Sequence, residues 1–295
     1  QEKTKDILRC LDAYTPQRLH LKGLFCSSKA LLSASLYYQK PRNFCFVFAS
    51  KEEAHYFHTD LESLSDGKKV LFLDSSFKRE VHPENYENNK VHLRTEALGE
   101  ISLKEGTPSL VVTYTEAIAE KVISKKKLTD KTIQIKVNEE MNMDALSEQL
   151  SLWDFERTDF VYEAGQYAVR GGIVDVFSYA HDYPYRLDFN GNTIESLREF
   201  DPITQLSHKD VMWLNIVPKI NKEEDEQFST LLDYLPPDTL IWLKDGKDIK
   251  DGLSALKDTL LEKFESLPEF IQSFIGGDEF MAPLQKFHVL ELGTR

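Results

Sequence analysis

The stretch from Gly165 to Pro202, GQYAVRGGIVDVFSYAHDYPYRLDFNGNTIESLREFDP, carries the densest β-strand pattern in the chain. Tyr167 and Val169 alternate with small or polar neighbours, and Gly171-Gly172 then provides a turn. The residues 173–177 that follow are rich in β-branched and aromatic side chains, which favour strands. The pattern therefore predicts a β-hairpin in the first half of this stretch.

A second hairpin is predicted directly after the first one. One face of its first strand takes Tyr185, Leu187 and Phe189, and the other face takes Arg186, Asp188 and Asn190. Asn190-Gly191 is typical of a type I′ turn, which leads into a strand over residues 193–200. We expect a small antiparallel sheet that is apolar on one side, with Arg186 on the open side and Arg170 at the end of a strand.

The two arginines allow two interpretations. Charged side chains on the wet face of a half-exposed sheet often do no more than solvate it, and for either arginine alone this interpretation stays open. The guanidinium group is also a rigid fork of donors that fits carboxylates, and arginine is enriched among residues that carry binding energy. Arg170 and Arg186 near one sheet face therefore also predict a protein-recognition surface.

Three segments carry a resemblance to a known family: RGGIVDVF, PYRLDF and IESLREFDPITQ. They resemble the UvrB-like module at the N-terminus of bacterial transcription-repair coupling factor and, more distantly, the excision-repair protein UvrB. In that family the sheet belongs to the domain that binds UvrA, the damage-recognition ATPase. The resemblance places two UvrA-contacting arginines of the family at Arg170 and Arg186. A third contact, an aromatic residue in better-known members, falls on Asn190.

Length and composition restrict the function classes. At 295 residues the chain is expected to form two or three domains. Its 49 acidic and 36 basic residues give a net charge of −13, which repels phosphate backbones, so we expect little direct DNA binding. No apolar run approaches the length of about 18 residues that a membrane span needs. A start at Gln1 without Met suggests a fragment of a larger protein.

The cysteines indicate the cellular compartment. Cys10, Cys26 and Cys45 lack metal-ligand spacing, and an odd number without a disulfide framework suits a reducing cytoplasm. We interpret all three as buried, small apolar groups. The eight histidines are scattered, so the sequence predicts no metal site, no cofactor and no catalytic residues.

The first part of the chain alternates between strand and helix patterns, which is typical of a parallel α/β fold. With the resemblance, this predicts a degenerate P-loop NTPase-like sheet, similar to the first domain of UvrB. We expect residues 1–127 to form its first part, residues 128–212 to form an inserted α+β domain of the UvrA-interaction type, and residues 213–295 to complete the NTPase-like module.

Residues 23–30, GLFCSSKA, lie where the P-loop signature G-x-x-x-x-G-K-[ST] would stand. Gly23 and Lys29 match the first glycine and the lysine. Ser28 replaces the second glycine, which adds a Cβ where the backbone must approach phosphate, and Ala30 replaces the hydroxyl that holds Mg²⁺. A solvated lysine at the start of a helix is the alternative interpretation.

The segment LLDYLPPDTLIWLKDGKD resembles the part of UvrB that ends in the paired acids of a Walker B motif. The resemblance puts Lys244 at the first acid and Asp245 at the second. A cation at the first position opposes Mg²⁺ binding. Ala30 and Lys244 are thus two independent replacements of groups that would hold the metal. We interpret the chain as a nucleotide-binding fold without hydrolysis.

The preferred hypothesis is a non-catalytic module that mimics UvrB and recruits UvrA in transcription-coupled nucleotide excision repair. The resemblance implies that other domains of a full-length, ATP-driven DNA translocase, with its motor and RNA-polymerase-binding domains, can mask the same surface. The alternative is an active ATP-dependent helicase or nucleotide-binding domain. A DNA-binding adaptor is a third class, against which the acidic balance argues.

Overall fold

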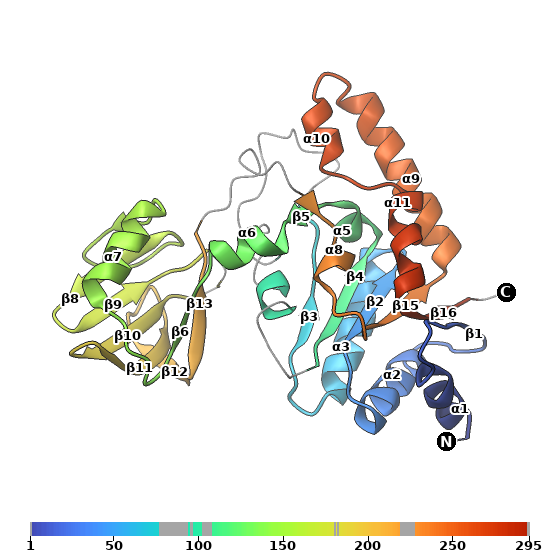
Figure 1. The fold of residues 1–295 in the computed structure, drawn as a ribbon, viewed down its shortest axis with the longest axis horizontal. Coiled ribbons are helices and arrows are strands. Elements are labelled where there is room, and N and C mark those ends of the chain that lie inside the picture. The colour runs from blue at the N-terminus through green and yellow to red at the C-terminus, as the bar shows by residue number, and fades with distance from the viewer. Residues whose placement is uncertain are drawn as a thin grey trace. The chain divides into compact units, whose positions relative to one another are not determined.

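The computed structural model describes residues 2–76, 94, 97–101, 108–179, 181, 183–218 and 228–293 (Figure 1). The chain divides into two compact units. The first unit combines residues 1–122 with residues 228–295, and the second unit is the continuous segment 123–227. The second unit is therefore inserted into the sequence of the first, and the predicted class, an α/β protein with an inserted α+β part, is confirmed.

A six-stranded sheet is the centre of the first unit. Its order is β1-β16-β15-β2-β4-β3, and all pairings are parallel. The strands are β1 (Arg18–Leu21), β2 (Phe44–Phe48), β3 (Val70–Phe72), β4 (Leu110–Tyr114), β15 (Leu240–Lys244) and β16 (His288–Leu292). Every residue of β2 and β4 is buried, as expected for central strands of a parallel sheet that is covered on both faces.

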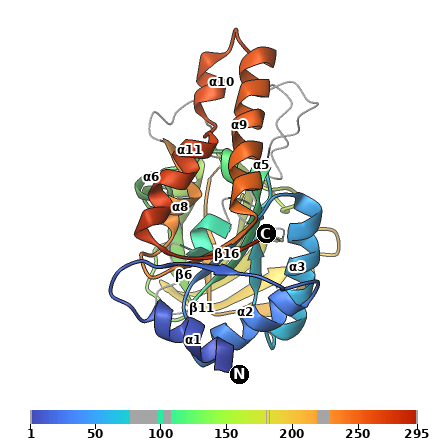
Figure 2. The same ribbon diagram turned by 90° about the vertical axis from the view of Figure 1, so that its right-hand side faces the viewer.

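The helices of the first unit pack against this sheet or against one another. They are α1 (Glu2–Leu11), α2 (Ser28–Gln39), α3 (Lys51–Leu64), α5 (Thr115–Ala119), α8 (Leu231–Tyr234), α9 (Gly246–Lys263), α10 (Pro268–Gln272), α11 (Gly277–Met281) and the 3₁₀ helix Ala282–Lys286. Figure 2 shows α1 and α2 together at the lower end of the view and α10 at its upper end. Apolar side chains of α1, α2 and α3 share one core with Phe46, Trp242 and Leu290 of the sheet. Within the described residues, none of the helices has the length and apolar character to cross a membrane.

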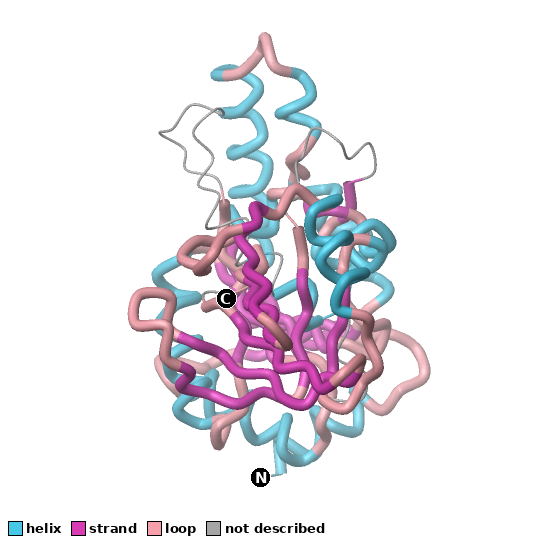
Figure 3. Tube along the Cα trace, turned by 90° about the vertical axis from the view of Figure 1, so that its left-hand side faces the viewer, coloured by secondary structure: helices cyan, strands magenta, loops and turns pink. Residues whose placement is uncertain are grey.

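The second unit contains a six-stranded sheet, which is drawn among the magenta strands of Figure 3. Its strand order is β12-β11-β10-β9-β8-β7. Its strands are β7 (Glu156–Arg157), β8 (Gln166–Arg170), β9 (Ile173–Val176), β10 (Tyr185–Asn190), β11 (Thr193–Phe200) and β12 (Ser207–Val211). All pairings are antiparallel except that of β7 with β8. The helices are α6 (Lys125–Asp130) and α7 (Met143–Leu152).

Two strand pairs lie outside the large sheets. β6 (Ile133–Lys136) pairs with β13 (Trp213–Ile216), and β5 (Val122–Ile123) pairs with β14 (Phe228–Ser229). The sequence placed the end of the inserted domain at residue 212, but β13 belongs to the second unit. The physical reason is the antiparallel ladder that β13 forms with β6, a partner almost eighty residues earlier in the chain.

The apolar face of the second unit's sheet lies where the alternation predicted it. Tyr185 and Leu187 of β10 are buried and belong to one core, together with Val174 of β9. Leu146 and Leu150 of α7 belong to the same core. The helix thus packs on the apolar face, which fixes Arg186 and Asp188 on the opposite face.

The turn between β10 and β11 differs from the predicted type I′ turn. Asn190 pairs with Thr193, so the central residues of the turn are Gly191 and Asn192. Gly191 has φ +63, and it alone among the four turn residues has a positive φ. A type II′ turn needs a positive φ at its first central residue only, and glycine adopts it without strain.

The cysteines do not share one environment. Cys45 on β2 is buried, whereas Cys10 and Cys26 are exposed, so the interpretation that all three are buried is wrong for two of them. Burial raises the pKa of the Cys45 thiol to about 12. We expect a thiol-alkylating reagent to label Cys10 and Cys26 in the native chain and Cys45 only after unfolding. Mass spectrometry of the modified peptides measures this, and fast labelling of Cys45 in the native state would contradict it.

Candidate protein-docking site

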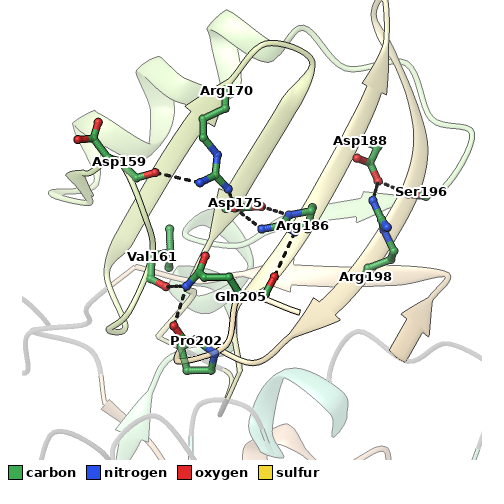
Figure 4. A network of polar contacts seen from close by, with 10 residues as sticks. All are labelled: Asp159, Val161, Arg170, Asp175, Arg186, Asp188, Ser196, Arg198, Pro202 and Gln205. Atoms are coloured by element: carbon green, nitrogen blue, oxygen red, sulfur yellow. Dashed lines mark hydrogen bonds and ion pairs between the residues drawn. The ribbon is translucent and has the colours of Figure 1, made fainter. Parts of the chain in front are cut away.

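A buried carboxylate organises the polar face of the second unit's sheet (Figure 4). Asp175 lies on β9, between β8 and β10, and its side chain is 0% exposed. It accepts hydrogen bonds from Arg186 Nε at 2.7 Å and from Arg186 Nη2 at 2.9 Å. Arg170 Nη2 forms an ion pair with the same carboxylate. One aspartate therefore holds both candidate arginines.

Strand register explains this meeting. Asp175 is the cross-strand partner of Ala168 on β8 and of Arg186 on β10, and paired residues point to the same face of a sheet. Arg170 lies two residues beyond Ala168 and so on the same face. The alternation of side chains along three neighbouring strands thus brings Arg170 and Arg186 to Asp175.

Arg170 has a second set of contacts in the loop that follows β7. Its Nη1 donates to the backbone oxygen of Asp159 at 3.1 Å, and its Cζ lies 4.8 Å from the centre of the Phe160 ring. The Arg170 side chain is 35% exposed. Its guanidinium group is thus fixed by three neighbours and still reaches solvent.

Arg186 is held more tightly. Its Cζ lies 4.7 Å from the centre of the Phe200 ring, and Nη1 approaches the backbone oxygen of Gln205 at 3.4 Å. Its side chain is 17% exposed. The hydrogen bonds to Asp175 raise the pKa of the Arg186 guanidinium above its usual value. Arg186 therefore presents a small, charged and immobile part of its side chain to solvent.

The polar face is less open than the alternation suggested. A small core of Val161, Ala168, Phe177 and Phe200 lies beside the arginines. Gln205 Nε2 donates to the backbone oxygens of Val161 at 3.0 Å and Pro202 at 2.6 Å, which ties the loop after β11 to the loop after β7. The two loops cover part of the face, and the arginines lie at the edge of this cover.

Arg170, Arg186 and Asp175 together carry one net positive charge, and Asp188 also acts electrostatically on Arg186. Two guanidinium groups share the single carboxylate of Asp175. A guanidinium has five N–H donors, and the bonds within the described residues use two of them on Arg170 and three on Arg186. The remaining N–H groups can donate hydrogen bonds to a carboxylate of a partner.

Asn190 does not belong to this cluster. It is exposed at the last position of β10, four residues after Arg186, which corresponds to about 13 Å along a strand. The structure thus brings together two of the three residues predicted to contact a partner, and it places the third at the hairpin end of the sheet.

Sequence reasoning missed several residues of this face. Asp175, Gln205 and Phe160 all contact the arginines. Beside them, Asp188 accepts from Ser196 and forms an ion pair with Arg198. An aspartate within the apolar run IVDVF was the available signal, because a charge in a central strand needs a partner of opposite charge.

The candidate nucleotide residues lie at the carboxyl edge of the first unit's sheet. Leu21, at the end of β1, and Lys244, at the end of β15, both pair with Leu292 of β16. The loop 22–27 and the segment Lys244-Asp245 therefore begin on either side of β16. This is the edge at which parallel α/β sheets bind ligands.

The turn before α2 is closed on itself. The N–H of Ser28 donates to Phe25 O at 3.1 Å, and the N–H of Lys29 approaches Cys26 O at 3.5 Å, so these amides are engaged within the turn. Lys29 Nζ lies 3.9 Å from Glu53 Oε1, and Ala30 is fully buried in the core. Gly23 has φ +81, so the turn itself explains a glycine there.

Lys244 and Asp245 pair with each other. Asp245 has φ +54 and precedes α9, and its N–H donates to Leu292 O at 2.7 Å. The Lys244 ammonium group is bound to the Asp245 carboxylate, and it therefore takes the place of a metal ion that would need the same carboxylate. In the described part of the chain, no group of three or more His, Cys, Asp or Glu residues is arranged to hold a metal ion. The residues present do not fit Mg²⁺ with ATP.

Comparison with known proteins identifies the inserted unit. Residues 133–221 match the family described as the UvrB interaction domain. With this domain inserted into a parallel α/β unit, the chain is similar to a UvrB-like module. More particularly, it is similar to the N-terminal UvrB-like module of bacterial transcription-repair coupling factor, which confirms the resemblance that the sequence segments carried.

Three relatives show the extent of the similarity. The transcription-repair-coupling factor of Myxococcus xanthus is 28% identical over 208 residues, which is 68% of this chain and 17% of that protein. The factor of Escherichia coli is 38% identical over 84 residues, 28% of this chain and 7% of that protein. The UvrABC system protein B of Streptococcus uberis is 34% identical over 82 residues, 28% of this chain and 12% of that protein. The chain thus spans less than a fifth of each relative's length.

Proposed function

We propose that the chain is a non-catalytic protein-interaction module that mimics UvrB and binds UvrA, so that a stalled transcription complex recruits nucleotide excision repair. The pair Arg170 and Arg186, oriented by the buried Asp175, is the observation that carries this proposal. Rigid arginines in a partly desolvated setting are the kind of residue that dominates protein interfaces. The match of residues 133–221 to the UvrB interaction domain supports the same role.

The setting of the module follows from the same proposal. It works in the cytoplasm as part of a longer DNA translocase, whose motor and RNA-polymerase-binding domains are further partners and can mask Arg170 and Arg186. The net charge of −13 supports little direct contact with DNA.

Calorimetric titration of the 295-residue chain with UvrA tests the proposal. We expect saturable binding with a fixed stoichiometry, which persists when salt is raised to a level that screens non-specific contacts between charges. An acidic protein of similar size, added in place of the chain, is the control. Heats no larger than those of the control would end the proposal.

Retention of Gly23 and Lys29 is the one observation that favours a nucleotide-dependent enzyme instead. Against it stand the pairing of Lys29 with Glu53 and of Lys244 with Asp245. The chemistry of hydrolysis requires a bound Mg²⁺, and the two positions that would hold this ion carry Ala30 and Lys244. We therefore assign no hydrolysis to the chain.

We expect no release of phosphate when the chain is incubated with ATP and Mg²⁺. The rate should equal that of the Lys29→Ala variant, and ATP with Mg²⁺ should leave the unfolding temperature unchanged, because a ligand that binds only the folded state raises it. A sensitive phosphate assay and a thermal melt measure both. Turnover by the parent chain above that of Lys29→Ala would favour the enzyme.

A further inference from the structure

We propose that an apolar rim next to the arginines forms a second part of the UvrA contact. The rim consists of Phe160 and Tyr162 in the loop after β7 and of Ile203 and Leu206 in the loop after β11. It binds apolar side chains that flank an acidic residue of UvrA. This inference rests on the proposed function and adds to it the residues that supply apolar contact.

All four rim side chains are exposed to solvent. Phe160 is 48% exposed, Tyr162 53%, Ile203 85% and Leu206 69%. A single exposed apolar residue is common on protein surfaces and needs no explanation. These four lie on two loops that border one charged cluster, and exposed apolar residues gathered beside polar groups mark interaction sites.

The rim is joined to the arginines by specific bonds. Phe160 stacks against the Arg170 guanidinium, and its neighbour Asp159 accepts a hydrogen bond from the same group. Gln205, between Ile203 and Leu206, approaches Arg186 through its backbone oxygen and reaches Val161 through its side chain. The two loops and both arginines are thus fixed relative to one another.

A fixed surface of this kind loses little conformational entropy when a partner binds. The Gln205 side chain donates to Val161 in one loop and to Pro202 in the other, so it holds the two loops together. The backbone of Gln205 has φ +62, a conformation that these hydrogen bonds must maintain. The loops therefore present their apolar side chains before any partner arrives.

The chemistry of the face defines its occupant. The N–H donors of Arg170 and Arg186 that their bonds to Asp175 and the two loops leave over fit a carboxylate of the partner. Apolar side chains beside that carboxylate would cover the rim and exclude water from the new ion pair, which strengthens it. A strand or loop of UvrA with an acidic residue between apolar residues meets both requirements.

The residue at position 190 of this chain, Asn190, is a further reason to propose the rim. The aromatic contact that the resemblance places at position 190 is an amide here, and it lies about 13 Å along β10 from Arg186. The apolar contact that position 190 lacks would then come from the opposite end of β10, where the loop after β11 begins. The rim provides it.

The test compares variants of the whole 295-residue chain in titrations with UvrA. Ile203→Ser/Leu206→Ser removes one half of the rim and Tyr162→Ser removes part of the other. We expect the double variant to bind about ten times more weakly or worse. Leu152→Ser and Met212→Ser are the controls, since these residues are 77% and 69% exposed in the same unit but lie outside the rim. We expect the controls to bind like the parent chain.

Circular dichroism and unfolding temperatures verify that each variant is folded, and Tyr162→Ser gives a second reading from a separate loop. Parental affinity in both rim variants, while Arg170→Ala/Arg186→Ala still loses affinity, would overturn the rim and leave the proposed function intact. Equal losses in the rim variants and the controls would also overturn it. If the parent chain itself does not bind UvrA, the proposed function fails, and the rim fails with it.

Discussion

Replacement of Arg170 and Arg186 by alanine is expected to weaken UvrA binding by about 1–3 kcal/mol for each arginine. The reason is geometric as well as electrostatic. Asp175 holds both guanidinium groups in fixed positions, so each presents its remaining donors without loss of side-chain entropy on binding. Isothermal titration calorimetry with UvrA measures the loss.

Two further variants separate the causes of this loss. Arg157→Ala removes an exposed arginine on β7 of the same sheet and should leave the affinity unchanged. Arg170→Lys/Arg186→Lys keeps both positive charges but removes the planar fork, so it should bind almost as weakly as the alanine pair. Parental affinity in the alanine pair, with a retained fold, would show that these arginines only solvate the sheet.

Local sequence patterns predicted the strands of the proposed docking face correctly, but not the type of turn between β10 and β11. The alternation of Tyr185, Arg186 and Leu187 assigned each side chain to a face, because side chains of a strand point to opposite sides in turn. Gly191 marked the hairpin for an equally local reason, the ease with which glycine takes a positive φ. Such rules need no knowledge of the rest of the chain.

These local patterns could not predict which residues contact the two arginines. Asp175 meets Arg186 only because β9 and β10 pair in one particular register, and a shift of one residue would place it on the other face. Gln205 contacts Arg186 because the loop after β11 folds back over the sheet. Both contacts depend on the tertiary fold, which no pattern within a strand encodes.

At the candidate nucleotide residues, too, the residue types could be read from the sequence, whereas their contacts could not. The sequence revealed Ala30 and Lys244 as departures from the motifs, since residue type alone decides whether an oxygen can hold Mg²⁺. It did not reveal that Lys29 lies near Glu53 or that the turn amides already have acceptors. The structure thus adds a second reason for the proposed absence of hydrolysis, which is the prior engagement of the retained lysine.

The double role of Asp175 links stability to docking. A buried carboxylate is costly in a protein interior unless charged partners compensate it, and here Arg170 and Arg186 do so. The same interaction that stabilises the sheet therefore orients the residues proposed to bind UvrA. A binding surface built in this way cannot lose its central residue without a loss of stability.

We accordingly expect Asp175→Ala to lower the free energy of unfolding of the second unit by about 3–5 kcal/mol, the cost of removing one partner from a buried ion pair. Asp210→Ala is the control, because Asp210 is an exposed aspartate in the same sheet row on β12, and its loss should change stability by no more than about 0.5 kcal/mol. Urea unfolding followed by circular dichroism measures both.

A double-mutant cycle shows whether the ion pair itself is the cause. In the Asp175→Ala background Arg186 has already lost its carboxylate, so Arg186→Ala should cost less there than in the parent chain, and the two effects should not add. Additive effects, or a loss below about 1 kcal/mol for Asp175→Ala, would show that Asp175 does not hold the arginines in solution. Urea midpoints of the four proteins, measured with an unchanged slope, decide between these outcomes.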